Sequence, residues 1–203
     1  MLKKSVLFVV FALTLAASTA LAKGEMSFTV MGGIHSPTGD NSDVLKKGFL
    51  AGASGDYMVS ENFAVGVNVF WSKNDFKDFS IVDDSTTPAT LIAVTGDQTI
   101  IQGGAHAKFM IPMESSFRPY FIAGPGIYHG KASLKANGVD VPDEFLPSSS
   151  KVGGRIGAGV SFKAGEKMNV LVEGNYHIVN TEDEKTKFVT ATAGLQFGFG
   201  SSK

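Results

Sequence analysis

One stretch near the C-terminus limits what this chain can fold into more than any other, because its side chains alternate strictly in character. The residues on one face are Ala191, Ala193, Leu195, Phe197 and Phe199, and those on the other are Thr190, Thr192, Gly194, Gln196 and Gly198. Alternation with a period of two predicts a β-strand whose two faces meet different surroundings. Alone, this stretch would also fit the edge strand of a soluble sheet, so the rest of the chain has to decide.

The same alternation recurs along the chain and predicts eight strands. Their expected ranges are 27–35, 47–59, 63–73, 97–111, 118–130, 151–163, 167–179 and a last strand ending at 199. Long loops at 36–46, 74–96 and 131–150 and a shorter polar loop at 180–186 alternate with tighter turns at 60–62, 112–117 and 164–166. This pattern is typical of an up-and-down barrel that crosses an outer membrane. Only the fifth strand leaves its facing open, and Pro125 within it predicts a bulge or a rim position.

The N-terminus predicts export. Lys3 and Lys4 precede an apolar run, and Ala20-Leu21-Ala22 forms a small-residue cleavage site, so we expect a signal peptide at 1–22 and a barrel domain at 23–203. A retained N-terminal anchor is the alternative, although the apolar run is short of the ~20 residues that a spanning helix needs. Without the leader the chain carries 16 basic and 19 acidic residues, which argues against nucleic acid as a partner. The absence of Cys excludes disulfides and thiolate metal sites.

The composition of the second face distinguishes a membrane barrel from a soluble ligand-binding barrel. The face opposite the apolar one is mostly Gly, Ser, Thr, Asn and Gln, and charges on it are isolated at Asp56, Lys108, Arg155 and Glu173. Such a face is too small and too weakly charged for a water-exposed exterior. It suits the narrow lumen of an eight-stranded barrel, which side chains can just fill. The apolar face then meets lipid.

A lumen that holds few charges predicts that they pair, because a lone buried charge is costly. A three-residue turn at 164–166 would place Glu173 opposite Gly157, with Arg155 as its diagonal neighbour. Tyr176 would then lie against Gly154 on the outer face. We therefore expect an ion network of Lys108, Arg155 and Glu173 inside the barrel.

The closing stretch also carries a recognisable motif. Thr192, Gly194, Phe197 and Phe199 follow the order polar, any, Gly, two of any, aromatic, any, aromatic, which resembles the closing-strand signal of bacterial outer-membrane β-barrels. The stretch 118–128, Gly157-Ala158-Gly159-Val160 and Val172-Glu173-Gly174-Asn175-Tyr176 are similar to the fifth, sixth and seventh strands of small barrels of the OmpA/OmpX type. Pro125 and the tail 200–203 depart from the family pattern.

That resemblance implies an all-β fold: an eight-stranded antiparallel up-and-down transmembrane β-barrel in the outer membrane of a Gram-negative cell. It further implies that the barrel assembly machinery reads the closing strand and that outer-membrane lipid surrounds the wall. We expect a structural or surface-interaction role in which extracellular loops bind a host or surface ligand. A narrow, porin-like channel for small solutes is the alternative.

Motifs for chemistry are weak throughout, so we expect no enzyme activity, cofactor or metal. The histidines at 35, 106, 129 and 177 lack zinc-ligand spacing. The run Asp40-Asn41-Ser42-Asp43 hints at a calcium loop but lacks its Gly and its final Glu. Some outer-membrane barrels are lipid-modifying hydrolases with a spaced His-x-Ser pair, whereas His35 and Ser36 are adjacent here.

Overall fold

The computed structural model describes residues 25–39, 41–77, 79–83, 90–113, 115–142, 144, 146, 148–181 and 185–199. The predicted signal peptide and its cleavage after Ala22 lie outside these residues, as do Asp40 and the tail 200–203. The described residues are all-β apart from a short helix, α2, which covers Asn41–Val44. None of the helices in the described ranges is long and apolar enough to span a membrane.

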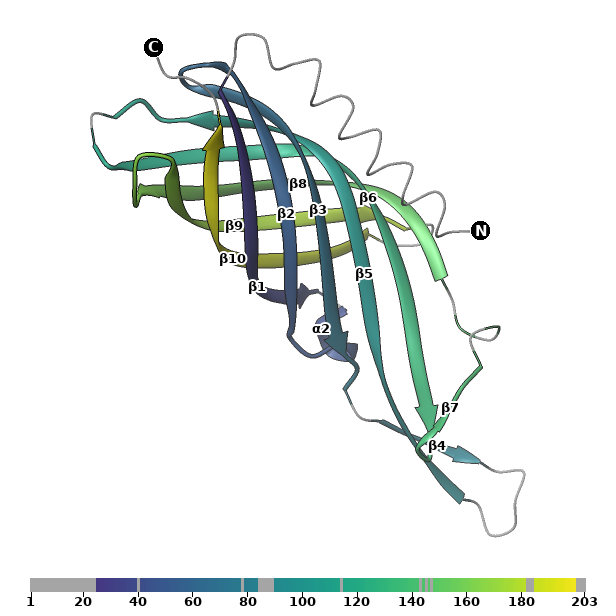
Figure 1. Ribbon diagram of the computed structural model, residues 1–203. Coiled ribbons are helices and arrows are strands. Elements are labelled where there is room, and N and C mark those ends of the chain that lie inside the picture. Colours follow the sequence, from purple (N-terminus) through teal and green to yellow (C-terminus); the bar gives the residue numbers. More distant parts are fainter. Residues whose placement is uncertain are drawn as a thin grey trace.

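Eight long strands form the wall of a closed barrel (Figure 1). They are β1 (Met26–Thr38), β2 (Gly48–Ser60), β3 (Phe63–Asp75), β5 (Thr90–Met110), β6 (Phe117–Ala136), β8 (Ser148–Lys163), β9 (Met168–Asn180) and β10 (Lys185–Phe199). Each pairs antiparallel with its neighbours in the chain, β5 pairs with β6, and β1 pairs with β10 from Met26↔Phe199 to Thr38↔Lys187. The predicted eight-stranded up-and-down barrel is therefore confirmed.

The wall is apolar on the outside. Side chains such as Val69, Ile156 and Val172 are 53%, 61% and 51% exposed, whereas their neighbours Asn68, Arg155 and Glu173 are 7%, 4% and 3% exposed. An exposed apolar exterior around a buried polar interior inverts the arrangement of a soluble protein and requires lipid around the wall. Edge-on aromatic pairs lie near its two ends: Phe49 with Trp71 at the long-loop end, and Phe117 with Phe162 at the tight-turn end.

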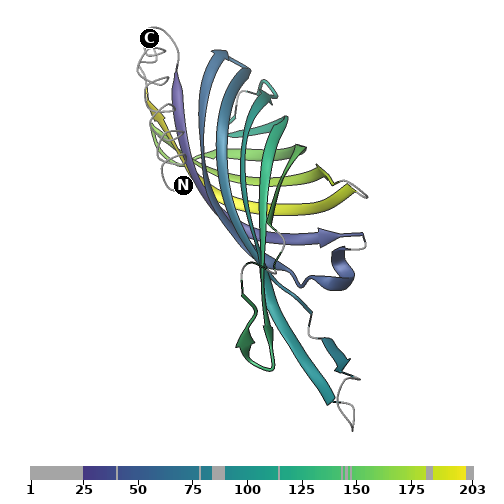
Figure 2. The ribbon, with the colours of Figure 1, turned by 90° about the vertical axis from the view of Figure 1, so that its right-hand side faces the viewer.

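The predicted loops at 74–96 and 131–150 are wrong in part. β5 already begins at Thr90 and β6 continues to Ala136, and the two remain paired up to Val94↔Ala136. Two short strands flank them: β4 (Phe79–Asp83) pairs with β5, and β7 (Val139–Asp140) pairs with β6. This four-stranded arm projects beyond the barrel at the end that carries α2 (Figures 1 and 2).

Strand β6 resolves the facing that the sequence left open. Tyr120, Ile122 and Tyr128 are 2–3% exposed and point inward, while Phe121 and Ile127 face lipid. Large inward side chains on this one strand hide the alternation. The predicted bulge at Pro125 is wrong, because the β5–β6 register is the same on both sides of it, and Pro125 lies mid-strand opposite Gly154. The ladder to β5 omits the pairs opposite Gly124 and Pro125, as expected where the N–H is missing.

The predicted register between β8 and β9 is also wrong, by two residues. Lys163 pairs with Asn169, so Glu173 lies opposite Gly159 and Arg155 lies opposite His177. Consequently Tyr176 pairs with Ile156, not with Gly154. The turn is longer than expected, because the backbone N–H groups of Ala164 and Gly165 both donate to the carbonyl of Met168. A shift of two preserves which face each side chain occupies.

Candidate functional site

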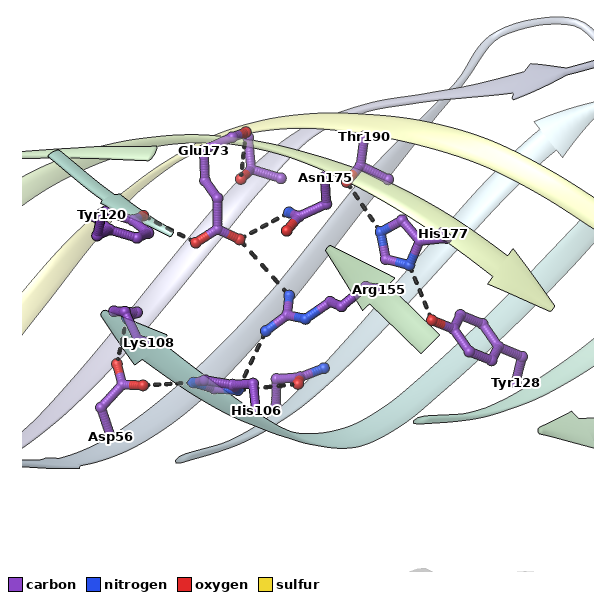
Figure 3. A network of polar contacts seen from close by, with 12 residues as sticks. Asp56, His106, Lys108, Tyr120, Tyr128, Arg155, Glu173, Asn175, His177 and Thr190 are labelled. Carbon is purple, nitrogen blue, oxygen red and sulfur yellow. Dashed lines mark hydrogen bonds and ion pairs between the residues drawn. The ribbon is translucent and has the colours of Figure 1, made fainter. Parts of the chain in front are cut away.

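The three residues predicted for the lumen, Lys108, Arg155 and Glu173, come from β5, β8 and β9 and are all buried inside the barrel, at 5%, 4% and 3% exposure (Figure 3). The structure brings Arg155 and Glu173 together directly: Nη1 lies 3.7 Å from Oε1. Lys108 instead pairs with Asp56 of β2, and its link to the other two runs through His106. The polar network is therefore wider than the predicted trio.

Asp56 is the centre of the half nearer the tight turns. Lys108 Nζ donates to its Oδ2 at 2.8 Å, and its Oδ1 lies 2.5 Å from His106 Nε2. Gly66 of β3 makes room for this contact, since a Cβ there would lie 2.7 Å from both Asp56 Oδ1 and His106 Nε2. Lys108 Nζ also lies 5.1 Å from the centroid of the Tyr120 ring, a cation–π distance.

His106 connects the two halves, and its contacts define its tautomer. Arg155 Nη2 lies 3.2 Å from His106 Nδ1, and because a guanidinium only donates, Nδ1 must accept. The proton then sits on Nε2 and is donated to Asp56. Nδ1 is also 3.3 Å from Asn68 Oδ1, and turning that amide by 180° would present its NH₂ group instead. His106 therefore lies between the Asp56 carboxylate and the Arg155 guanidinium and contacts both.

Glu173 is the centre of the other half. Tyr120 Oη donates to its Oε2 at 2.9 Å, and Asn175 Nδ2 donates to its Oε1 at 2.8 Å. Gly159 lies directly opposite Glu173, and a Cβ at Gly159 would come within 2.5 Å of Tyr120 Oη. With two cations and two carboxylates, these buried charges balance, which lowers the cost of removing them from water.

Aromatic and imidazole rings close the lumen toward the long loops. The rings of His177 and Phe188 stack at 4.4 Å, and His35 meets Phe188 edge-on at 4.3 Å. Tyr128 Oη lies 3.0 Å from His177 Nδ1, and Thr190 Oγ1 lies 3.3 Å from Nε2. A second apolar cluster, of Tyr120, Ile122, Leu171 and Met110, lies toward the tight turns.

Little free space remains between these clusters. The cavity beside Arg155 and His177 has a volume of about 20 Å³, which is room for about one water molecule. The lumen is therefore packed with side chains along its middle. The polar network thus serves to fill and brace the barrel.

Sequence reasoning missed three of the residues that carry this network. Asp56 was visible as an isolated inward charge, and His106 as an inward polar residue two positions before Lys108, yet neither was assigned a partner. Tyr120 was hidden by the ambiguous facing of its strand. Their partners come from strands far apart in the sequence. The only signal that the sequence offered was that each of these side chains lies on the inward face of its strand.

The weaker chemical candidates find no support in the geometry. His35 is 1% exposed, faces the lumen and packs on Phe188, while Ser36 lies on the other face of β1, so the two form no lipid-facing pair. Ser42 belongs to α2, and its hydroxyl donates to the carbonyl of Gly39. Among the described residues, no group of three or more His, Asp or Glu side chains is placed to hold a metal ion.

The predicted assembly residues lie in β10, where the barrel closes. Thr192 is 4% exposed and donates to the backbone carbonyl of Glu173, whereas Phe197 and Phe199 face outward at 36% and 57% exposure. Gly194 packs so closely that a Cβ would lie 2.7 Å from Met31 Cβ. Recognition of this strand by the assembly machinery stays a prediction.

A closed eight-stranded antiparallel wall with an apolar exterior and a charge-balanced, packed lumen defines a small outer-membrane β-barrel. The family model for the outer membrane protein beta-barrel domain matches residues 7–199, and the chain belongs to that family. This membership indicates an outer-membrane location.

A solved structure shows the same fold. Neisserial surface protein A is 15% identical with a TM-score of 0.58, and the match covers 87% of this chain and all of that one. Ail, the attachment invasion locus protein of Yersinia pestis, is 19% identical with a TM-score of 0.49, covering 87% of this chain and 99% of its own. Comparison with curated proteins gave no match.

Proposed function

We propose that this protein is a surface-interaction barrel whose arm, formed by β4, β5, β6 and β7, binds a ligand outside the cell. The observation that carries the proposal is the length of two strands: β5 has 21 residues and β6 has 20, against 13 each in β1, β2, β3 and β9. A strand of thirteen residues is long enough to cross the membrane as part of the wall. The additional length therefore builds a structure beyond the membrane.

The arm is an ordered scaffold. Asn137 and Gly138 have φ values of 50° and 81°, which suit the two-residue turn that joins β6 to β7. Asn137 Oδ1 accepts a hydrogen bond from the backbone N–H of Ala93 at 3.0 Å, which ties that turn to β5. At the base, the backbone N–H of Phe76 donates to Gly96. A scaffold that is already ordered loses little conformational entropy on binding.

The arm also offers chemistry suited to a partner. β4 and β7 are the outer strands of this small sheet, and edge strands present backbone groups that can pair with another chain. Val139 is 70% exposed on β7, next to the exposed Lys135–Asp140 ion pair at 3.2 Å. Exposed apolar and charged groups on one rigid edge favour recognition of an extended segment of another protein.

The alternative, a channel for small solutes, is disfavoured by the packing of the lumen. The rings of Phe188, His177 and Tyr128 fill one end, the Tyr120 cluster lies toward the other, and the cavity between them is about 20 Å³. A conducting pore would need both clusters to move. We therefore assign the activity to the arm and a supporting role to the barrel.

The test uses the full-length protein in lipid nanodiscs on an array of immobilised extracellular-matrix proteins and glycans. Deleting residues 79–94 and 134–147 removes the arm while leaving short connections above Asp97 and Lys131. A single substitution, Gly138→Ala, tests the turn because it strains a backbone with φ +81°. Its control is Gly130→Ala, whose added Cβ meets nothing within 4 Å. We expect array binding to be lost on deletion, reduced severalfold by Gly138→Ala and unchanged by Gly130→Ala. The proposal would be overturned if the deletion variant bound the array as well as the wild type does. It would also be overturned if the protein conducted ions steadily and its binding did not depend on the arm.

A further inference from the structure

A groove of about 780 Å³ crosses the lipid-facing wall of the barrel, separate from the lumen. Its floor is formed by residues without side chains beyond Cβ, namely Ala107, Ala123, Ala158 and Gly174. Larger side chains rise on either side: Phe109 and Phe121 on one, Ile156 and Tyr176 on the other. The strand register explains this shape, because Phe121 pairs with Ala158 in one row and Ala123 pairs with Ile156 in the next.

The lining of the groove favours an apolar occupant. Two of its polar members, Asn175 and Thr190, direct their side chains into the lumen, where Asn175 donates to Glu173 and Thr190 contacts His177. The third, Tyr176, is on the outer face and carries one hydroxyl group. The backbone groups of the floor are engaged in the ladders between strands. Apart from the Tyr176 hydroxyl, only dispersion contacts with alanine, glycine and ring surfaces remain, which favours a hydrocarbon chain.

The two ends of the groove differ in charge. At the tight-turn end it begins at Phe63, two residues after the acidic Glu61. At the long-loop end it finishes at Val189, and Lys187, two residues earlier on β10, lies on the same outward face and is exposed. Lys185 lies on that face as well, so two cations stand above this end, and the sequence just before them is acidic at 182–184. A phosphate group is complementary to that end and is repelled at the other.

We propose that this groove is a binding site for one phosphate-bearing lipid of the outer leaflet, with an acyl chain along the floor and the phosphate at Lys187. The groove is continuous with the lipid-facing wall, so its occupant comes from the medium already in contact with that surface. A second copy of the barrel fits less well, because a convex wall cannot follow a groove bounded by rings on both sides.

The test compares lipids that remain bound to the detergent-purified, full-length protein in native mass spectrometry. Phosphatidic acid is the probe, and diacylglycerol with the same chains lacks only the phosphate. Gly174→Leu fills the floor, and its Cβ would meet nothing nearer than the Thr190 carbonyl oxygen at 4.0 Å. Gly103→Leu is the matched control, because it also faces lipid and meets nothing within 4 Å but lies outside the groove. Retained heat-modifiability shows that each variant is folded.

We expect the wild type to retain one molecule of phosphatidic acid. In Gly174→Leu the occupancy of that site should fall at least tenfold, and in Gly103→Leu it should equal that of the wild type. Lys187→Gln should bind phosphatidic acid and diacylglycerol equally, and Lys187→Arg should restore the preference for phosphate. Equal loss in Gly174→Leu and Gly103→Leu would overturn the proposal. A dimer that is lost in Gly174→Leu would also overturn it, because the occupant of the groove would then be a second copy. Retention of phosphatidic acid that is the same in the wild type and in every variant would overturn it as well.

Discussion

Replacing Asp56 by Asn should destabilise the barrel by about 3–5 kcal/mol, the usual cost of removing one partner from a buried ion pair. The Lys108 and Asp56 side chains are only 6% and 2% exposed, so solvent cannot take over the role of the lost carboxylate. At 2.8 Å and an effective dielectric constant of about 20, their attraction is roughly 6 kcal/mol before desolvation is subtracted. Asn would leave Lys108 as an uncompensated buried cation.

The double change Asp56→Asn with Lys108→Met should recover most of that loss, because the remaining groups carry no unpaired charge. Glu173→Gln should cost less, about 1–3 kcal/mol, since Gln can still hydrogen-bond with Tyr120 and Asn175 and loses mainly the 3.7 Å charge contact with Arg155. Arg155→Met in that background should offset part of the cost.

Urea unfolding in lipid vesicles measures these free energies, with Trp71, the only tryptophan, as the fluorescent reporter on the lipid-facing wall. Asp97→Asn is the matched control, because its pairing with Lys73 at 3.2 Å is 27–37% exposed and should be worth at most about 1 kcal/mol. Additive losses in the Asp56–Lys108 double-mutant cycle, or an Asp97→Asn loss as large as that of Asp56→Asn, would refute this account of the lumen.

Three further outcomes are expected. Gly66→Val should lower the folded, heat-modifiable fraction sharply because its Cβ would lie 2.7 Å from buried polar atoms, whereas Gly103→Val should not. Phe199→Ala should reduce the assembled fraction in cells more than Ala191→Gly does, and equal assembly would contradict the role of the closing strand. Phe188→Ala should raise the planar-bilayer conductance above a low wild-type level by opening the ring cluster at the long-loop end, and an unchanged conductance would place the block elsewhere.

Strand number, facing and topology followed from the sequence because they depend on properties local to each strand. Alternation with a period of two separates the lipid face from the lumen face wherever the lumen residues are small or polar, as in β3 and β10. It failed in β6, where Tyr120 and Tyr128 fill the lumen with rings as large as those outside. Alternation also predicted strands that are too short in the arm. Beyond the membrane the two faces of a strand no longer meet different surroundings, so apolar and polar residues need not alternate there.

The tertiary structure decided which of the lumen residues contact one another. A register shift of two residues leaves every side chain on its own face, so alternation cannot distinguish Glu173 opposite Gly157 from Glu173 opposite Gly159. Only the hydrogen bonds of the turn at 164–167 choose between them. Likewise, Asp56 reaches His106 because β3 lies between their strands and contributes Gly66, which has no side chain to separate them. Outside β6, the sequence by itself determined which residues share the lumen, and closure of the barrel determined which of them touch.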